Sequence, residues 1–205
     1  ANLSLYMDQN VVRLTTGTRV ASTVVVNLDG GAFASGGASL ITEGWGGSGT
    51  VKAGDVFTIG DVFAVNPMSG ASTGVLKQFV VTADEVDTGA NMTIAFSPAI
   101  VYGATNAYSN VNALPLNHAA VTFVGGNSVA YPQNLLFHPN AFALVTVPIE
   151  MPANVWGARE SDPDAGLSIR VVKQYDIDAD EEIIRLDILY GIKTLYPELA
   201  VRLWG

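Results

Sequence analysis

Short apolar runs separated by glycine-rich turn clusters are the feature that most restricts how this chain can fold. Residues 17–74 hold 13 of the 21 glycines, and in them runs such as ASLIT, DVFTI and DVFAV alternate with clusters such as DGGAFASGG and EGWGGSGT. Short apolar runs bounded by Gly, Asn, Asp and Ser are typical of β-strands. Strands at spacings of about ten residues, five or six of them here, predict a small barrel or sandwich.

The segment KAGDVFTIGDVFAVNP, residues 52–67, is interpreted as two short strands around one turn. Its first half places Val56 and Thr58 on one face and Phe57 and Ile59 on the other, and an apolar run resumes after a Gly-Asp break. In the later run MTIAFSPAI, proline cannot donate to a sheet ladder. We therefore expect Pro98 to end its strand or to lie on an edge.

From about residue 131 the pattern of apolar runs and turn clusters changes. HPNAFAL predicts a helical turn that leads into a strand, and LSIRVVKQYDI and EEIIRLDILYGI predict two long strands joined by DADE. We expect residues 167–175 and 182–192 to pair antiparallel. Alternation then gathers six apolar side chains on one face, which we expect to be buried. They are Leu167, Ile169, Val171, Ile184, Leu186 and Ile188.

Composition excludes several classes of protein. The 205 residues are 49% hydrophobic and 14% charged, so the chain can bury a sizeable core, but its clean apolar stretches, such as FALVTV, are far too short to span a bilayer. The absence of cysteine excludes disulfides, thiolate metal sites and cysteine nucleophiles. A net charge of −9, spread over both halves, opposes binding to nucleic acid or anionic lipid.

The first residues, ANLSLYMDQN, lack the basic and then apolar pattern of a signal peptide. They also lack an initiator methionine. We expect either that methionine was removed or that this is the downstream part of a longer polypeptide.

The acidic run DIDADEEIIRLD is the first candidate for a metal site. Asp176, Asp178 and Asp180 alternate, and Asp187 stands at the twelfth position, as in a calcium loop. The sixth position of such a loop requires glycine for a sharp turn, and here it is Glu181. We therefore interpret the run as a solvated hairpin tip, whose charges also discourage pairing with other strands.

Other residues with catalytic potential lack the required patterns. His118 and His138 are 20 residues apart and outside any metal or triad motif, and His138 precedes a proline where helix capping or packing is the expected role. Glu160, Asp162 and Asp164 lie in turn-forming sequence, although acid pairs serve glycosidases. The glycine-rich loops lack a phosphate-binding spacing. We predict no catalytic, cofactor-binding or metal-binding residues.

Several segments, taken in order, resemble a known family. They are VKAGDVFTIGDVFAVNP, STGVLKQFVVTAD, SPAI, YPQNLLFHPNAFALVTVPIEMP and GLSIRVVKQYDIDADEEIIRLDILYGIKTLYPELAVRLWG. Together they are similar to the downstream half of the major capsid proteins of short-tailed double-stranded-DNA phages of enteric bacteria. The resemblance covers roughly residues 5–205. Asp61 departs from it, since related sequences tend to have a small or apolar residue there.

The resemblance implies the α+β, strand-rich capsid fold of tailed phages of the Hong Kong type. Residues 1–16 and 128–205 would belong to its axial and peripheral core, and residues 17–127 would form an inserted small β-barrel. The family's N-terminal arm, extended loop and spine helix would belong to a missing upstream half. In this reading residues 52–67 form a barrel hairpin that packs and does not react.

The function implied is that of a structural subunit of an icosahedral shell, not an enzyme. Such a subunit assembles into pentamers and hexamers around packaged double-stranded DNA, without reading its sequence. Its partners would be other coat subunits, with scaffolding and portal proteins, and neither a cofactor nor a membrane. It would be made in the bacterial cytoplasm and end in the virion.

The alternative function is that of a secreted β-rich carbohydrate-binding or adhesive module, which would explain the glycine, serine and threonine loops. Such modules commonly present several aromatic residues on one sheet face. Trp45, Trp156 and Trp204 are scattered along the chain. On either reading, we expect the segment from Thr18 to Gly126 to fold by itself.

Overall fold

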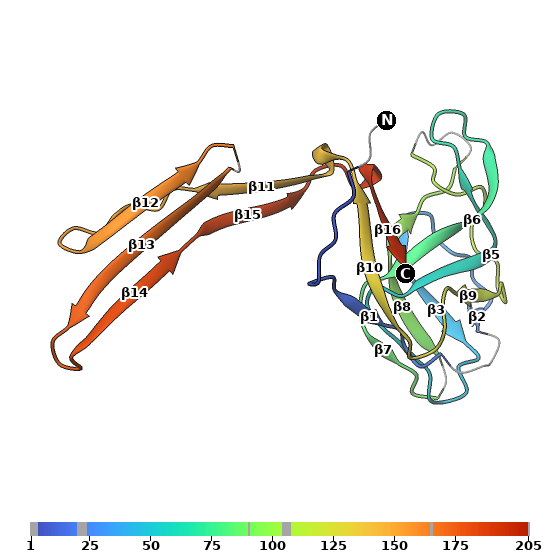
Figure 1. Cartoon of the computed structure of the whole chain (residues 1–205). Coiled ribbons are helices and arrows are strands. Elements are labelled where there is room, and N and C mark those ends of the chain that lie inside the picture. Colours follow the sequence, from blue (N-terminus) through green and yellow to red (C-terminus); the bar gives the residue numbers. More distant parts are fainter. Residues whose placement is uncertain (1–3, 20–23, 90, 104–107, 165, 205) are drawn as a thin grey trace. The chain divides into compact units, whose positions relative to one another are not determined.

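The computed structural model describes residues 4–19, 24–89, 91–103, 108–164 and 166–204. Strands dominate it (Figure 1), and the chain divides into two compact units, unit 1 (Ala1–Gln133) and unit 2 (Asn134–Trp204). The strand-rich part of the predicted fold class is confirmed. Within the described ranges the only helices are two short 3-10 helices, so the α part of the predicted α+β class has no counterpart there.

The strands that begin in unit 1 are β1 (Arg13–Thr15), β2 (Val25–Val26), β3 (Gly37–Glu43), β4 (Thr50–Val51), β5 (Val56–Val65), β6 (Ser72–Val81), β7 (Glu85–Val86), β8 (Met92–Ile100), β9 (Val121–Phe123) and β10 (Ala130–Phe137). Six of them form one antiparallel sheet in the order β2-β3-β8-β6-β5-β9. β4 pairs with β7, and β1 pairs with the start of β10.

Backbone hydrogen bonds also join the two edges of the six-stranded sheet. Val26 N donates to Ala119 O, and Val121 N donates to Val24 O, each at 2.9 Å. β2 is therefore bonded to β3 on one side and to the residues around the start of β9 on the other. Neither edge at this end of the sheet is left open, which protects it from pairing with another chain.

Residues 52–67 do not form the predicted hairpin. β5 runs through Val56–Val65 as one strand, and both its halves pair with β6. The Gly-Asp break does not reverse the chain, because Asp61 takes a left-handed conformation (φ 63°) where the register shifts between Thr58 and Phe63. The pattern that indicated a turn is thus a bulge in a continuous strand.

Pro98 does not end its strand either. β8 continues to Ile100 and lies inside the sheet, between β3 and β6. The register of β3 and β8 shifts between the pairs Ser39–Ala95 and Gly37–Ile100, which bracket Pro98. A bulge is one of the places where a strand tolerates a residue that cannot donate to the ladder.

Aromatic rings form the centre of the core of unit 1. Phe57 is fully buried, and its ring centroid lies 5.6 Å from that of Phe79, 5.7 Å from that of Phe96 and 5.6 Å from that of Phe123. Trp45 packs edge-on against Phe123, and its Nε1 donates to Thr42 Oγ1. Alternate residues of β5, β6 and β8 therefore supply one continuous apolar core.

Unit 2 contains the 3-10 helices η1 (Pro139–Ala141) and η2 (Pro197–Leu199) and the strands β11 (Phe142–Val147), β12 (Trp156–Asp162), β13 (Leu167–Asp176), β14 (Glu181–Asp187), β15 (Leu189–Thr194) and β16 (Ala200–Trp204). β12, β13 and β14 form an antiparallel sheet in that order (Figure 1), β11 pairs with β15, and β16 is bonded to β10. The predicted helical turn leading into a strand is confirmed by η1 and β11.

The predicted C-terminal hairpin is confirmed in its pairing. β13 and β14 are antiparallel, with Val171 opposite Leu186 and Lys173 opposite Ile184, and the turn between them is residues 177–180. Cross-strand partners share a face, so the predicted apolar face exists. The second strand is shorter than predicted, however. β14 ends at Asp187, and the chain then changes partner, as β15 pairs with β11.

The expected burial of that apolar face is wrong for this chain by itself. Leu186 is 70% exposed, Ile184 61% and Ile188 50%. Strand alternation determines which side chains share a face, but a sheet face is buried only when another layer packs on it. On β13, Leu167 and Ile169 are 39% and 38% exposed and Val171 is half-buried, so the described residues of unit 2 cover this face only in part.

Candidate functional site

The acidic run of the β13–β14 hairpin lies where the sequence predicted, in an exposed turn. Asp178 N donates to the side chain of Asp176, and the hydroxyl of Tyr175 bonds to Asp180, which raises the pKa of Tyr175. Asp187 lies on β14 and bonds to two arginines, apart from the aspartates of the turn. Across the described ranges no three His, Asp or Glu side chains gather as a metal site would require.

The two histidines have separate structural contacts. His138 Nδ1 accepts from Asn140 N at 3.2 Å and caps η1, as predicted. His118 Nδ1 lies 3.2 Å from Glu43 Oε1 on an exposed surface of unit 1. Within the described part of the chain, neither histidine contacts a serine or the other histidine, so no triad forms around them there.

Glu160, Asp162 and Asp164 lie on β12 and the turn after it. All three are exposed, and Asp162 Oδ1 accepts from Asp164 N, which is a local turn bond. Glu160 is paired across the ladder with Ile169. The three acids thus face solvent and do not line a cleft.

A clasp of polar contacts holds together two segments of unit 1 that are far apart in sequence. It consists of Thr16, Arg19, Asp55, Gly126 and Val129. Thr16 N donates to Val129 O and Val129 N donates to Thr16 Oγ1, each at 3.0 Å. Gly126 O accepts from Thr16 Oγ1 at 2.7 Å and from Arg19 Nη2 at 2.9 Å. The residues before β2 are thereby fixed to those after β9.

Arg19 and Asp55 are the buried charges of the clasp. Arg19 Nη2 lies 3.9 Å from Asp55 Oδ1, and Asp55 Oδ2 accepts from the backbone N of Gly17 and of Lys52. Burial lowers the pKa of Arg19, and the charge of Asp55 opposes that shift. Gly17 is required by close approach, because a Cβ there would lie 2.1 Å from Thr50 O. No sequence pattern indicated this pair, since its members are 36 residues apart.

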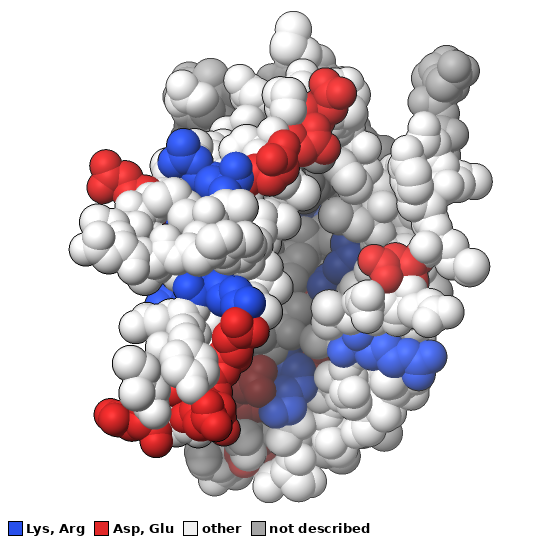
Figure 2. Space-filling model, turned by 60° about the vertical axis from the view of Figure 1, so that its left-hand side comes forward, with Lys and Arg blue, Asp and Glu red and all other residues white. Residues whose placement is uncertain are grey.

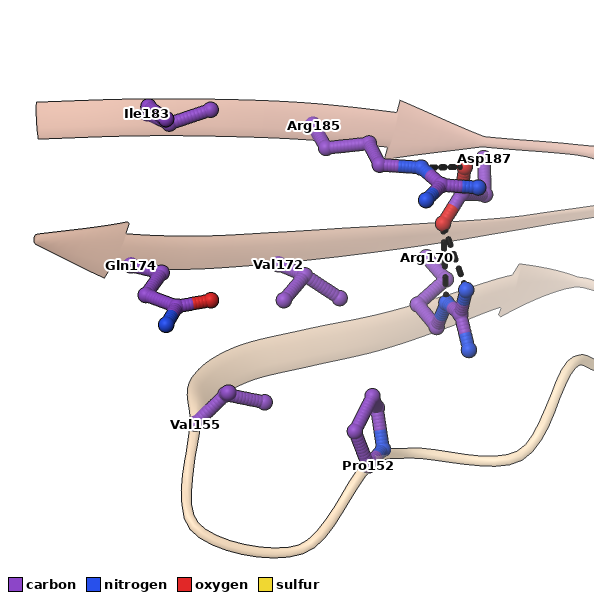
Figure 3. A pocket seen from close by; sticks show the side chains of 8 residues that line it. All are labelled: Pro152, Val155, Arg170, Val172, Gln174, Ile183, Arg185 and Asp187. Carbon is purple, nitrogen blue, oxygen red and sulfur yellow. Dashed lines mark hydrogen bonds and ion pairs between the residues drawn. The ribbon is translucent and has the colours of Figure 1, made fainter. Parts of the chain in front are cut away.

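A groove in unit 2 contains a second group of charges (Figure 3). Asp187 Oδ2 accepts from Arg170 Nε at 3.1 Å and Nη2 at 2.6 Å, and Oδ1 accepts from Arg185 Nε at 2.6 Å. The bonds from Arg170, with those from Arg185, lower the pKa of Asp187. The carboxylate therefore stays ionised between two guanidinium groups.

The largest feature of unit 2 is exposed apolar surface. Apart from Ala141, none of its described apolar residues is buried. Even the β11–β15 ribbon shows apolar side chains on both faces, as the neighbours Leu144 and Val145 are 56% and 57% exposed. Figure 2 shows that uncharged residues cover most of the surface in view, with acidic and basic residues in small patches, some of which adjoin. Such a surface is typical of a contact surface for other protein.

The tryptophans do not form a common binding face. Trp45 is buried in the core of unit 1 at 1% exposure. Trp156 lies on β12 and Trp204 on β16, which belong to different sheets. The aromatic platform that the carbohydrate-binding alternative requires is therefore not assembled by these residues.

Comparison with known proteins gives one family match and one similar solved structure. The family described as P22 coat protein, gene protein 5, matches residues 38–205. The solved structure of the CUS-3 coat protein I-domain is similar over 50% of this chain and 95% of that chain, with 25% sequence identity and a TM-score of 0.35. No curated protein matches the chain. Within the described ranges, no helix has the length and apolarity needed to cross a membrane.

Proposed function

Because the chain belongs to the P22 coat protein family, it is a structural subunit of a phage capsid, and we propose that it forms the pentamers and hexamers of an icosahedral shell around packaged double-stranded DNA. Membership also implies that it associates with copies of itself and is located in the capsid of the virion. Beyond family membership, we propose the icosahedral symmetry of the shell and the double-stranded DNA as its content.

The observation that carries the proposal is the exposed apolar surface of unit 2. A unit that buries only Ala141 among its described apolar residues cannot gain enough from its own packing to offset the entropy of ordering its strands. Contact with other protein would remove that surface from water. A shell, in which each subunit is surrounded by others, supplies such contacts on several sides.

The inserted domain of the proposed subunit is residues 17–127, folded as a small closed barrel, and residues 1–16 and 128–205 belong to the axial and peripheral core. Two observations support these limits. The edges of the six-stranded sheet are bonded to each other, as a closed barrel requires. The clasp brings residues 16–19 next to residues 124–129. The segment between them therefore begins and ends at the same place, as an inserted domain does.

The shell function needs no active site, and we propose that the subunit has no enzymatic activity. Its partners are other coat subunits, together with scaffolding and portal proteins during assembly in the bacterial cytoplasm. It encloses DNA without binding a specific sequence, and its net charge of −9 opposes tight attachment to the phosphate backbone. Substitution of His118, His138 or Asp178 should therefore remove no catalytic turnover.

The test is the mass of the assembly formed by the full-length protein, with scaffolding protein supplied. We expect megadalton shells in sedimentation velocity and electron microscopy. Leu186→Asp, on the apolar face of unit 2, should prevent them, whereas Leu116→Asp, at an exposed position of unit 1, should not. A monomer that is retarded on a polysaccharide column would instead support the carbohydrate-binding alternative.

A further inference from the structure

The groove of unit 2 has an apolar wall beside a positive charge. Its cavity measures about 290 Å³, and Pro152, Val155, Val172 and Ile183 line one part of it. The other part carries Arg170 and Arg185 around the single carboxylate of Asp187, so the three groups have a net charge of +1 (Figure 3). The groove therefore suits an apolar side chain that is followed closely by a carboxylate.

Arg185 is the charged residue of the groove that can still bind a carboxylate. Its side chain is 72% exposed, and only its Nε is bonded, to Asp187 Oδ1. Its two terminal nitrogens have no partner among the described residues. Arg170, by contrast, is 14% exposed and bonds to both Asp187 and the backbone of Glu150. A second carboxylate at the groove would thus meet Arg185 first.

The β13–β14 turn of the same chain has the complementary chemistry. Ile177 is 82% exposed and lies between Asp176 and Asp178. We propose that the groove of one copy binds this turn from a second copy, with Ile177 against the apolar wall and Asp178 at Arg185. Charge complementarity between groove and turn identifies the occupant. This inference rests on the proposed function, because it assigns one contact between shell subunits.

A chain cannot place its own turn in its own groove. The ladder of β13 and β14 is intact to the pair Asp176–Glu181, so the turn is confined to the far end of the hairpin. Arg185 is four residues from Glu181 along β14, which is about 13 Å at about 3.3 Å per residue. A contact between two different surfaces of identical copies is head-to-tail, and it closes into a ring when the rotation allows.

These 205 residues contain no cysteine, so cysteines introduced into them can be used for a cross-linking test. Full-length Val155→Cys protein is mixed during assembly with Ile177→Cys protein that carries a size tag, and the mixture is oxidised. We expect a disulfide-linked heterodimer at several times the yield obtained with Val201→Cys, an exposed valine on β16, in place of Val155→Cys. Equal yields would overturn the inference.

Charge reversal then tests the role of Arg185. Adding Arg185→Glu to the groove copy, or Asp178→Arg to the turn copy, should each lower the heterodimer yield several-fold, and combining them should restore it. Asp164→Arg on the turn copy, an exposed charge in the other turn of this sheet, should leave the yield unchanged. Recovery in the combined pair excludes simple misfolding by Arg185→Glu. A failure to recover would contradict the proposed pairing.

Two further measurements distinguish a failure of this inference from a failure of the proposed function. Electron microscopy of the same samples before oxidation counts shells: shells without the 155–177 heterodimer would overturn this inference and leave the proposed function standing. The heterodimer without shells would support the contact and contradict the shell. If Val155→Cys resists a small thiol reagent in the free monomer, another segment of the polypeptide fills the groove and the inference is wrong.

Discussion

Unit 1 and unit 2 bury their apolar residues in opposite ways. Of the twenty apolar residues that are buried among those described, only Ala141 belongs to unit 2. Both units nevertheless consist of strands paired in antiparallel ladders. The backbone is thus hydrogen-bonded in each, while a continuous apolar core is present among the described residues of unit 1 only. The contrast indicates that unit 1 is stabilised by its own core and unit 2 by its neighbours.

The largest test of this comparison is to separate the units. Residues 18–126 alone should give a monomer with a strand-type circular dichroism spectrum and one cooperative thermal transition. Residues 134–204 alone should aggregate, because their apolar faces remain in water. Sedimentation velocity and thermal melting distinguish the two. Narrow amide dispersion in an NMR spectrum of residues 18–126 would show that unit 1 has no independent core.

Truncation of single side chains should show the same contrast at a smaller scale. Phe57→Ala removes the centre of the aromatic core and should cost about 3–5 kcal/mol in free energy of unfolding. Leu186→Ala, at an exposed site, should change that energy by about 0.5 kcal/mol or less but should lower the yield of shells. Urea denaturation measures the first quantity. Similar losses from both changes would contradict the comparison.

The clasp of unit 1 should respond to the loss of its cation. Arg19→Met leaves Asp55 charged and buried with only two backbone donors, which should cost about 3 kcal/mol. The matched control is Lys52→Met at the exposed Lys52–Asp84 pair, where water replaces the lost partner and the change should be much smaller. Equal changes in the urea midpoint for the two variants would show that the buried pair adds nothing.

The smallest expected effect is a dependence on pH in unit 2. The folded-state pKa of Asp187 lies below its ordinary value of 3.8, so the ionised form favours the folded protein. The stabilisation is complete above pH 3.8 and is lost as the pH falls through the lower folded-state pKa. The melting temperatures of wild-type and Asp187→Asn protein should therefore differ at pH 7 and converge toward pH 3. A constant difference would exclude ionisation of Asp187 as its cause.

The sequence predicted local pairing well and burial poorly. The β13–β14 register followed from alternation alone, because side chains opposite each other share a face. Whether that face meets water depends on a second layer, which periodicity does not reveal. A Gly-Asp break fits either a turn or a bulge, so the sequence predicts a turn where the structure has a bulge at Asp61.

The two groups of paired charges were missed for a different reason. Asp187 was considered only as a member of the acidic run, whereas the fold places it between Arg170 and Arg185. Arg185 is two residues from Asp187 on the same strand. The contact with Arg170, by contrast, depends on how β13 and β14 pair. The Arg19–Asp55 pair depends on packing between segments that are farther apart in the sequence. Charged residues scattered along the sequence carry no periodic signal of these contacts.

The clasp should also affect how unit 1 responds to mechanical tension. Thr16 and Val129 are 113 positions apart, yet two hydrogen bonds join them directly: Thr16 N donates to Val129 O, and Val129 N donates to the Thr16 hydroxyl. We expect tension between the segments that flank residues 17–127 to pass across this junction and not through the intervening strands. The hydrophobic core of unit 1 should then stay folded under tension for as long as the junction holds.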